Sequence, residues 1–268
     1  MRIGTCASLE ECKTLREIGY DYAEIRFSRI VRMSDEEFEQ AQTSILQSGL
    51  LAEVCNLFFP SDFRLYAYDP LTQTTTEAFD EIKKSVYSYT RLGFSRAKQL
   101  GTEVVVIGSG GVRRRPADLS PDLALRQLAE ILIICADVAA EYGIAVTVEH
   151  LNEKETNVLV TLAEVLDLMD EIGHPNLYAM NDYYHSYMQN ESFSTLDRAG
   201  SRLKHIHICR HDRQFCTLAD RETLLPYVQY LSHLGYHGRI SFEGSVPKES
   251  HMQALREVHE LLTLFRDL

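Results

Sequence analysis

The sequence has no apolar run that approaches the roughly 18 residues needed to cross a membrane. Residues 1–4 lead directly into a strand-like run, without the apolar segment of a signal peptide. Basic residues are also scarce, because 27 Lys and Arg face 39 Asp and Glu and the net charge is −12. Since the phosphate backbone of a nucleic acid would be repelled by such a chain, we expect neither a nucleic-acid partner nor a membrane partner.

Paired cysteines are missing as well. The chain has six cysteines, and no two of them form a Cys-x-x-Cys motif. Disulfide frameworks are typical of short secreted chains, so in 268 residues these cysteines are interpreted as reduced, structural thiols. We therefore expect a cytoplasmic protein, with cysteines at positions 6, 12, 55, 135, 209 and 216.

What the sequence does contain is a regular alternation of short apolar runs and helical segments. Its length matches a (β/α)8 barrel, which typically has about 250 residues, and 45 % of its residues are hydrophobic. No linker, repeat array or low-complexity tract interrupts the alternation. Alternating strands and helices predict a parallel sheet, and eight units favour a closed TIM barrel over a doubly wound sheet. We predict an α/β fold, one barrel domain over 1–268, with strands at 2–6, 22–27, 50–57, 103–107, 145–149, 177–182, 203–208 and 239–243.

Four of these strands end in residues that can bind a metal. Glu149, Asp182, His207 and Glu243 are separated by 33, 25 and 36 residues, about one strand and helix each. Any one of these acids alone would be interpreted as a solvated strand end. Together on four adjacent strands they would meet at the C-terminal mouth, where unpaired carboxylates repel one another. The pattern therefore predicts one divalent metal ion, with Mn²⁺ or Mg²⁺ favoured and Co²⁺, Fe²⁺ or Zn²⁺ as alternatives.

Several further motifs are informative together: Asn56-Leu57-Phe58-Phe59-Pro60, Gly108-Ser109-Gly110-Gly111-Val112-Arg113, Glu149-His150-Leu151-Asn152, Glu155-Thr156-Asn157, Asp182-Tyr183-Tyr184-His185, His205-Ile206-His207 and residues 235–243. With these motifs the chain resembles the sugar phosphate isomerase/epimerase family with the xylose isomerase-like barrel, and within it ketose 3-epimerases of the D-tagatose 3-epimerase type. The resemblance implies that Glu149, Asp182, His207 and Glu243 hold the metal and that Glu149 and Glu243 form the acid/base pair. It also implies that Glu155, His185 and Arg213 contact the substrate.

Two positions depart from the family pattern. His150 stands where proline is usual after the glutamate of the fifth strand, and Asn181 stands where an apolar residue is common. Neither change removes a predicted ligand, but both leave the identity of the substrate open.

The expected chemistry is an epimerisation or isomerisation of a sugar. A ketose bound to the metal through its carbonyl and a neighbouring hydroxyl has an acidified α-proton, and the metal stabilises the resulting enediolate. Two carboxylates on opposite faces can remove a proton from one side and return one to the other, which inverts the carbon. Proton return to the adjacent carbon would instead interconvert aldose and ketose. Like other barrels of this family, the chain is expected to form a homodimer or homotetramer.

Other functions remain open on the same fold. A dehydratase of cyclic polyols or of 3-dehydroshikimate, or a hydroxypyruvate-type isomerase, would use the same metal site. A DNA-repair enzyme of the endonuclease IV type is disfavoured, because the third and fourth strands lack its histidines and the net charge is unsuitable. A sugar-binding protein without catalytic activity is disfavoured, because residues that can bind a metal stand at all four ligand positions.

Three further features allow two interpretations each. The segment Gly108–Gly111 with Arg113, Arg114 and Arg115 is either an anion site or a tight turn with solvated arginines. Glu24 is either a substrate contact or a buried structural acid, and His205 is expected to be a hydrogen-bonded interior histidine. The aromatic residues Phe58, Phe59, Phe63 and Tyr66 would line the pocket or form a protein interface.

Overall fold

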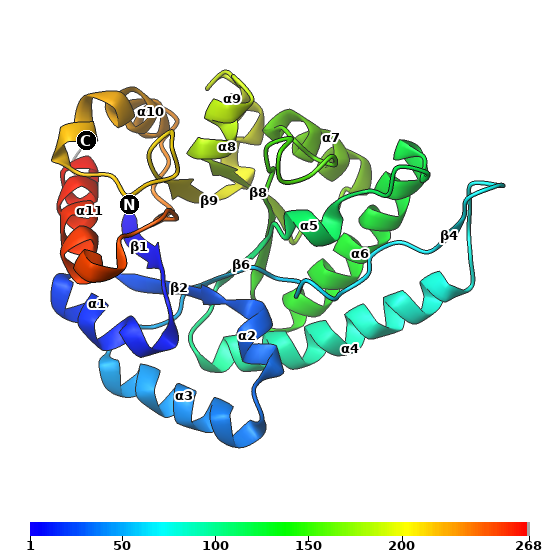
Figure 1. Ribbon diagram of the computed structural model, residues 1–268, viewed down its shortest axis with the longest axis horizontal. Helices are drawn as coiled ribbons and strands as arrows, with labels where there is room; N and C mark the ends of the chain where they lie inside the picture. Colours follow the sequence, from blue (N-terminus) through cyan, green and yellow to red (C-terminus); the bar gives the residue numbers. More distant parts are fainter. Residues whose placement is uncertain (267–268) are drawn as a thin grey trace.

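The computed structural model describes residues 1–266 and contains a closed barrel of eight parallel strands. Neighbours in the barrel follow the order β1-β10-β9-β8-β7-β6-β3-β2, so each strand pairs with the next along the chain and the last closes on the first. The predicted fold is thereby confirmed (Figure 1). The barrel strands are β1 (Arg2–Cys6), β2 (Tyr22–Arg26), β3 (Val54–Asn56), β6 (Val104–Ile107), β7 (Ala145–Val148), β8 (Leu177–Asp182), β9 (Leu203–Ile208) and β10 (Arg239–Phe242).

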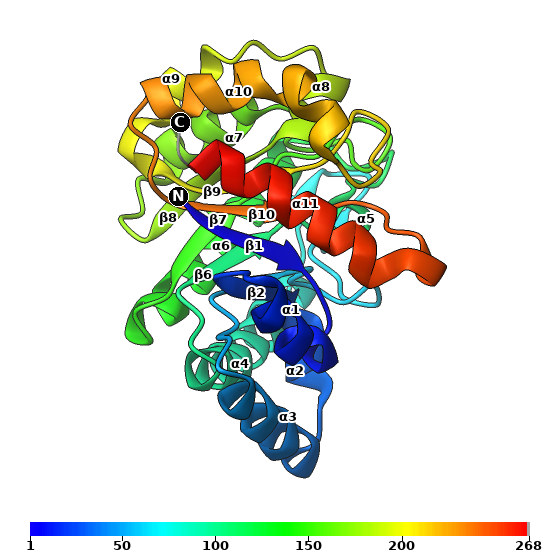
Figure 2. The same ribbon diagram turned by 90° about the vertical axis from the view of Figure 1, so that its left-hand side faces the viewer.

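Helices surround the barrel because they carry the connections between parallel strands (Figures 1 and 2). Their ends follow the capping signals of the sequence: Ser34 caps α3 in a capping box with Glu37, and left-handed Gly49 ends it. Pro121 begins α6 after the Ser120 cap. The helices are α1 (Cys12–Ile18), α2 (Phe27–Arg32), α3 (Asp35–Ser48), α4 (Ala78–Gln99), α5 (Gly110–Arg113), α6 (Pro121–Glu141), α7 (Leu162–Ile172), α8 (Tyr183–Met188), α9 (Thr195–Ala199), α10 (Arg221–His233) and α11 (His251–Arg266).

The structure adds short elements that the sequence did not predict. Helices α2, α5 and α8 lie at the C-terminal ends of strands, and β4 (Tyr68–Asp69) pairs with β5 (Thr74–Thr75) in a small antiparallel hairpin. The third barrel strand is also shorter than the predicted range 50–57. Its register pairs involve only Val54–Asn56, and at the C-terminal end Leu57 has a positive φ of 44° and leaves the sheet. No helix among residues 1–266 is long and apolar enough to cross a membrane.

The aromatic segment after β3 is part of the core, which neither of our two interpretations anticipated. Phe58 is fully buried, and its ring stacks on Phe27 with the centroids 4.4 Å apart. Phe94 and Tyr89 of α4 pack against the same pair of rings. This cluster fixes α2 and α4 against the end of β3, and so it supports the barrel mouth from outside.

Candidate metal centre

Four side chains meet at the C-terminal mouth of the barrel. Glu149 follows β7, Asp182 ends β8, His207 lies near the end of β9, and Glu243 follows β10. The Nδ1 atom of His207 lies 3.3 Å from Glu149 Oε1, 3.8 Å from Asp182 Oδ2 and 3.5 Å from Glu243 Oε2. One possible ligand atom from each residue falls within 4.8 Å of all the others. The structure thus brings together all four predicted ligands.

The donor atoms of this cluster fit a divalent cation. Glu149 Oε1, Asp182 Oδ2 and His207 Nδ1 are buried and make no hydrogen bond among the described residues. A buried polar atom without a partner is costly, and here three of them face one small space. Three carboxylate oxygens with one imidazole nitrogen form a donor set for a hard cation such as Mn²⁺ or Mg²⁺. A bound cation would satisfy all three atoms at once.

The close packing of the acids shifts their pKa values. Burial, and then the charge of Glu243, raise the pKa of Glu149 and raise the pKa of Asp182 to about 6. Burial acts the same way on Glu243, but the charges of His207 and Arg213 outweigh it and hold its pKa at about 2. Like charges at this spacing oppose one another, so a positive ion among them would favour the ionised form of each acid.

Asp182 faces the cluster and also caps a helix. Its Oδ1 accepts hydrogen bonds from the backbone N–H groups of Tyr184 at 2.7 Å and His185 at 3.4 Å, and so it caps α8 directly after the strand. Its other oxygen, Oδ2, accepts no hydrogen bond from the part of the chain that the structure describes, and so it can bind a metal. The cap fixes the carboxylate group, and it also places His185 beside the cluster.

Glu24 is a buried acid beside the cluster whose role the sequence did not settle. It lies fully buried in β2, where Oε1 accepts a hydrogen bond from His207 Nε2 at 2.8 Å and Oε2 accepts one from His205 Nε2 at 2.9 Å. Burial opposes its ionisation, yet the charges of His207 and then His205 lower the pKa of Glu24 well below its usual range. Glu24 holds a proton of His207 at Nε2, so the lone pair of the neutral ring is at Nδ1 and faces the cluster, as metal-binding histidines require. Burial opposes the charged form of His207, but the charges of Glu24 and Glu243 outweigh it and raise its pKa well above the usual range, so a metal ion would take the place of a second proton on Nδ1.

The three residues predicted to contact substrate also reach this mouth. Arg213 pairs with Glu155 and donates through Nη2 to Glu243 Oε2 at 3.2 Å. His185 Nδ1 accepts hydrogen bonds from Asn152 Nδ2 at 2.8 Å and from the Asn152 backbone N–H at 3.2 Å. Because Nδ1 accepts, the neutral ring carries its proton on Nε2. This atom is buried, has no hydrogen-bond partner among residues 1–266 and lies 3.7 Å from Asp182 Oδ2. His185 therefore offers one donor to the site.

The glycine-rich segment after β6 makes room for Glu149. A Cβ atom on Gly108 would lie 2.0 Å from Glu149 Oε2, so only glycine leaves this space to the carboxylate. The arginines that follow are not all solvated, which corrects our interpretation of a turn with exposed side chains. Arg113 is buried and donates through Nη1 to the Glu149 carbonyl oxygen at 2.8 Å. This hydrogen bond fixes the backbone of Glu149, a predicted metal ligand.

We expect Gly108→Ala to displace the Glu149 carboxylate and to lower turnover by about 10²-fold, the effect of a misplacement on the scale of 1 Å. Metal content after dialysis should fall as well. The matched control is Gly111→Ala, because a Cβ there meets nothing within 4 Å. Equal turnover and metal content in the two variants would show that the space at Gly108 is not needed.

The two departures from the family pattern lie in one buried hydrogen-bond chain. Tyr227 donates its hydroxyl to Asn181 Oδ1 at 2.6 Å, and Asn181 Nδ2 donates to Ser186 Oγ at 2.7 Å. Ser186 Oγ lies 3.1 Å from His150 Nε2. Burial lowers the pKa of His150 well below its usual range, so the ring is neutral, and its tautomer sets whether Nε2 donates to the Ser186 hydroxyl or accepts from it. His150 and Asn181 are thus mutually dependent, and each adjoins a predicted metal ligand.

Removing the hydroxyl in Ser186→Ala should leave Asn181 Nδ2 and His150 Nε2 without a partner. We expect the free energy of unfolding to fall by about 1–3 kcal/mol, the cost of an unsatisfied buried polar group. Urea denaturation measures this change. Ser44→Ala on the exposed side of α3 is the control and should stay within about 0.5 kcal/mol of the parent. Equal stability of the two variants would contradict the role of the chain of hydrogen bonds.

A closed barrel of eight parallel strands, with an acid–histidine cluster at its C-terminal mouth, places the chain among the TIM-barrel proteins. Within that class it belongs to the xylose isomerase-like TIM barrel family, whose sequence model matches residues 12–265. This membership confirms the resemblance found in the sequence.

Curated relatives are sugar epimerases. L-ribulose 3-epimerase of Methylomonas sp. (strain DH-1) is 31 % identical over 109 residues, 40 % of this chain and 38 % of the relative. The chain thus matches less than half the length of that relative. 3-dehydro-D-guloside 4-epimerase of Escherichia coli (strain K12) is 22 % identical over 256 residues, 93 % of this chain and 91 % of the relative.

Solved structures share the fold. A D-psicose 3-epimerase crystallised in the presence of D-fructose superimposes with a TM-score of 0.80 at 18 % identity, over 100 % of this chain and 99 % of that one. The apo form of 3-keto-D-glucoside 4-epimerase from E. coli gives a TM-score of 0.76 at 22 % identity over the full length of both chains.

Proposed function

We propose that the protein is a metal-dependent sugar epimerase, and specifically a ketose 3-epimerase. One observation carries the proposal: two carboxylates from β7 and β10, Glu149 and Glu243, lie 3.3 and 3.5 Å from the same nitrogen of His207. They come from the two outer strands of the four that build the cluster, so a substrate placed over His207 would have a carboxylate on either side. The epimerase relatives of the family support this function.

The site fits Mn²⁺, which we infer from its three oxygen donors and one nitrogen donor. When bound, such an ion supplies Lewis-acid chemistry, because it polarises a carbonyl group and stabilises the negative charge that follows proton loss. Its ligands in this chain would be Glu149, Asp182, His207 and Glu243, with Glu24 fixing the proton of His207.

The protein's own residues supply proton transfer and orientation. One of the two glutamates removes the proton from the substrate carbon, and the other delivers a proton to the opposite face, so the configuration inverts. Arg213 holds the Glu243 carboxylate at 3.2 Å and pairs with Glu155, which together would fix the substrate hydroxyls between them. His185 presents its Nε2–H to a substrate oxygen.

The test is an assay of the Mn²⁺-loaded protein with a panel of free ketoses in D₂O. A ketose 3-epimerase should produce the C3 epimer and incorporate one solvent deuterium at C3. Loss of water from a cyclic polyol would identify a dehydratase instead, and deuterium at C2 of an aldose product would identify an isomerase. Binding without any conversion would support a sugar-binding protein. The cytoplasmic location and a homodimeric or homotetrameric state stay predictions from the sequence.

A further inference from the structure

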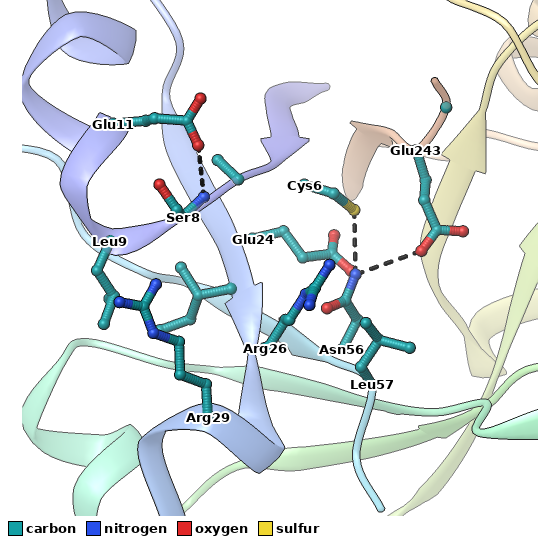
Figure 3. Close-up of a pocket in the computed structure, with 13 residues that line it drawn as sticks. Cys6, Ser8, Leu9, Glu11, Glu24, Arg26, Arg29, Asn56, Leu57 and Glu243 are labelled. Carbon is teal, nitrogen blue, oxygen red and sulfur yellow. Dashed lines mark hydrogen bonds between the residues drawn. The ribbon is translucent and has the colours of Figure 1, made fainter. Parts of the chain in front are cut away.

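A cavity of about 510 Å³ opens beside the proposed catalytic Glu243 (Figure 3). Cys6, Glu24, Arg26 and Asn56 line it on the side of Glu243, and Arg29 lines it farther away (Figure 3). Asn56 Nδ2 reaches both Cys6 Sγ at 3.1 Å and Glu243 Oε1 at 3.4 Å. This volume lies in the range of pockets for drug-sized ligands, which leaves room for a substituent on the sugar.

Arg26 is directed toward this cavity by the geometry of β2. Glu24 and Arg26 are two residues apart on one strand, so their side chains leave the same face of the sheet. Glu24 contacts histidines inside the barrel, and the same face at Arg26 opens on the mouth. Two residues along a strand span about 6–7 Å. Arg26 therefore lies about one residue layer above the metal centre, beside Asn56, its register partner on β3.

The charge of Arg26 is not compensated by the protein. Its side chain is exposed and makes no hydrogen bond or ion pair with any of residues 1–266. The other charged groups of the cavity have partners. Arg29 pairs with Glu10, with Nη1 donating to Oε2 at 3.0 Å, and Glu11 accepts from the Ser8 backbone N–H at 2.7 Å. Glu24 is bound by two histidines.

The acid at the inner end of the cavity is engaged as well. Glu243 contacts Arg213 and Asn56 in addition to the metal cluster. An anionic ligand in the outer part of the cavity would thus meet one free guanidinium, while the neighbouring carboxylates are held by other groups.

We propose that the substrate is an anionic sugar, and that Arg26 binds a phosphate or carboxylate at the end of the sugar remote from the reacting carbon. This inference rests on the proposed function and defines the substrate class of the same site. The planar guanidinium suits both anions, because each can accept two parallel N–H donors. The free sugar alone would leave Arg26 without a partner.

The experiment measures binding by isothermal titration calorimetry on the Mn²⁺-loaded protein, with D-fructose, D-fructose 6-phosphate and D-fructuronate as probes. Both anions should bind at least about tenfold more tightly than D-fructose, the effect expected of a charge-assisted contact. Arg26→Ala should abolish this advantage, and Arg26→Lys should keep part of it. Arg29→Ala removes a paired charge from the same cavity and should preserve the advantage.

If only one of the two anions bound more tightly than D-fructose, the result would support the subsite and identify its ligand. Equal affinity for all three probes, or no binding of any of them, would overturn the proposal. The proposal would also fail if the higher affinity for the anions survived in Arg26→Ala, or if Arg29→Ala abolished it to the same extent. Turnover in the same samples tests the proposed function separately. Epimerised D-fructose without an affinity difference would reject only the anion subsite, whereas tight binding of the anions without any conversion would reject only the epimerase.

Discussion

Replacing Glu243 by glutamine should lower kcat by at least about 10²-fold, and by up to about 10⁴-fold, the range for general acid–base catalysis. The amide keeps the shape of the side chain and an oxygen that can face the metal, but it cannot take up a proton. Asn56 and Arg213 donate to different oxygens of the carboxylate, at 3.4 and 3.2 Å, so the amide oxygen can keep one of these two contacts. Steady-state kinetics on a ketose that the parent enzyme converts would measure the loss.

Metal content must be measured in the same preparation, because Glu243 is also a proposed ligand. If Glu243→Gln retains metal and loses turnover, the residue acts in proton transfer. Turnover near that of the parent, with the metal still bound, would reject the two-carboxylate mechanism. As a control for the loss of one negative charge, Glu10→Gln changes an exposed acid outside the cluster and should leave kcat unchanged.

The second large effect is expected at Glu24, whose contact with the metal is indirect. Glu24→Gln leaves one oxygen to accept from two histidine N–H groups, so His205 or His207 loses its acceptor. The proton of His207 is then no longer confined to Nε2, and protonation of Nδ1 would compete with metal binding. We expect the affinity for Mn²⁺ to fall by about 10–100-fold, the usual effect of removing such a supporting contact.

Titration of the metal-free protein with Mn²⁺ measures this affinity without reference to turnover. His205→Phe is the informative comparison, because it removes the other histidine of the pair and leaves the contact between Glu24 and His207. Its metal affinity should stay close to that of the parent. Unchanged affinity in Glu24→Gln would mean that His207 is oriented by packing alone.

The sequence predicted the barrel and the four clustered residues because both depend on local and periodic signals. Each strand of a parallel barrel ends at the same rim, so residues spaced by one strand-helix unit reach the same place. Glu149, Asp182, His207 and Glu243 follow this rule without any knowledge of side-chain conformation. Capping residues such as Ser34 and Ser120 mark the beginnings of helices to within a few positions.

The supporting contacts were not predictable in this way. Glu24 and His207 are separated by 183 residues, and their pairing depends on which strands lie opposite each other across the barrel. The contact of Ser186 with His150 depends on α8, which begins directly after β8 without a loop. Its signal was Asp182, a good helix cap. We considered this residue only as a metal ligand, although its two oxygens serve both purposes.

The position of Glu24 also limits how the centre can be moved to another protein. All four proposed ligands lie in the second half of the chain, between residues 149 and 243, whereas the acid that fixes the histidine proton comes from β2. A half-barrel that begins at β7 would carry every ligand but would lack the group that prepares His207 to bind. A designer who transplants this centre therefore has to transfer five side chains, one of them from the opposite end of the sequence.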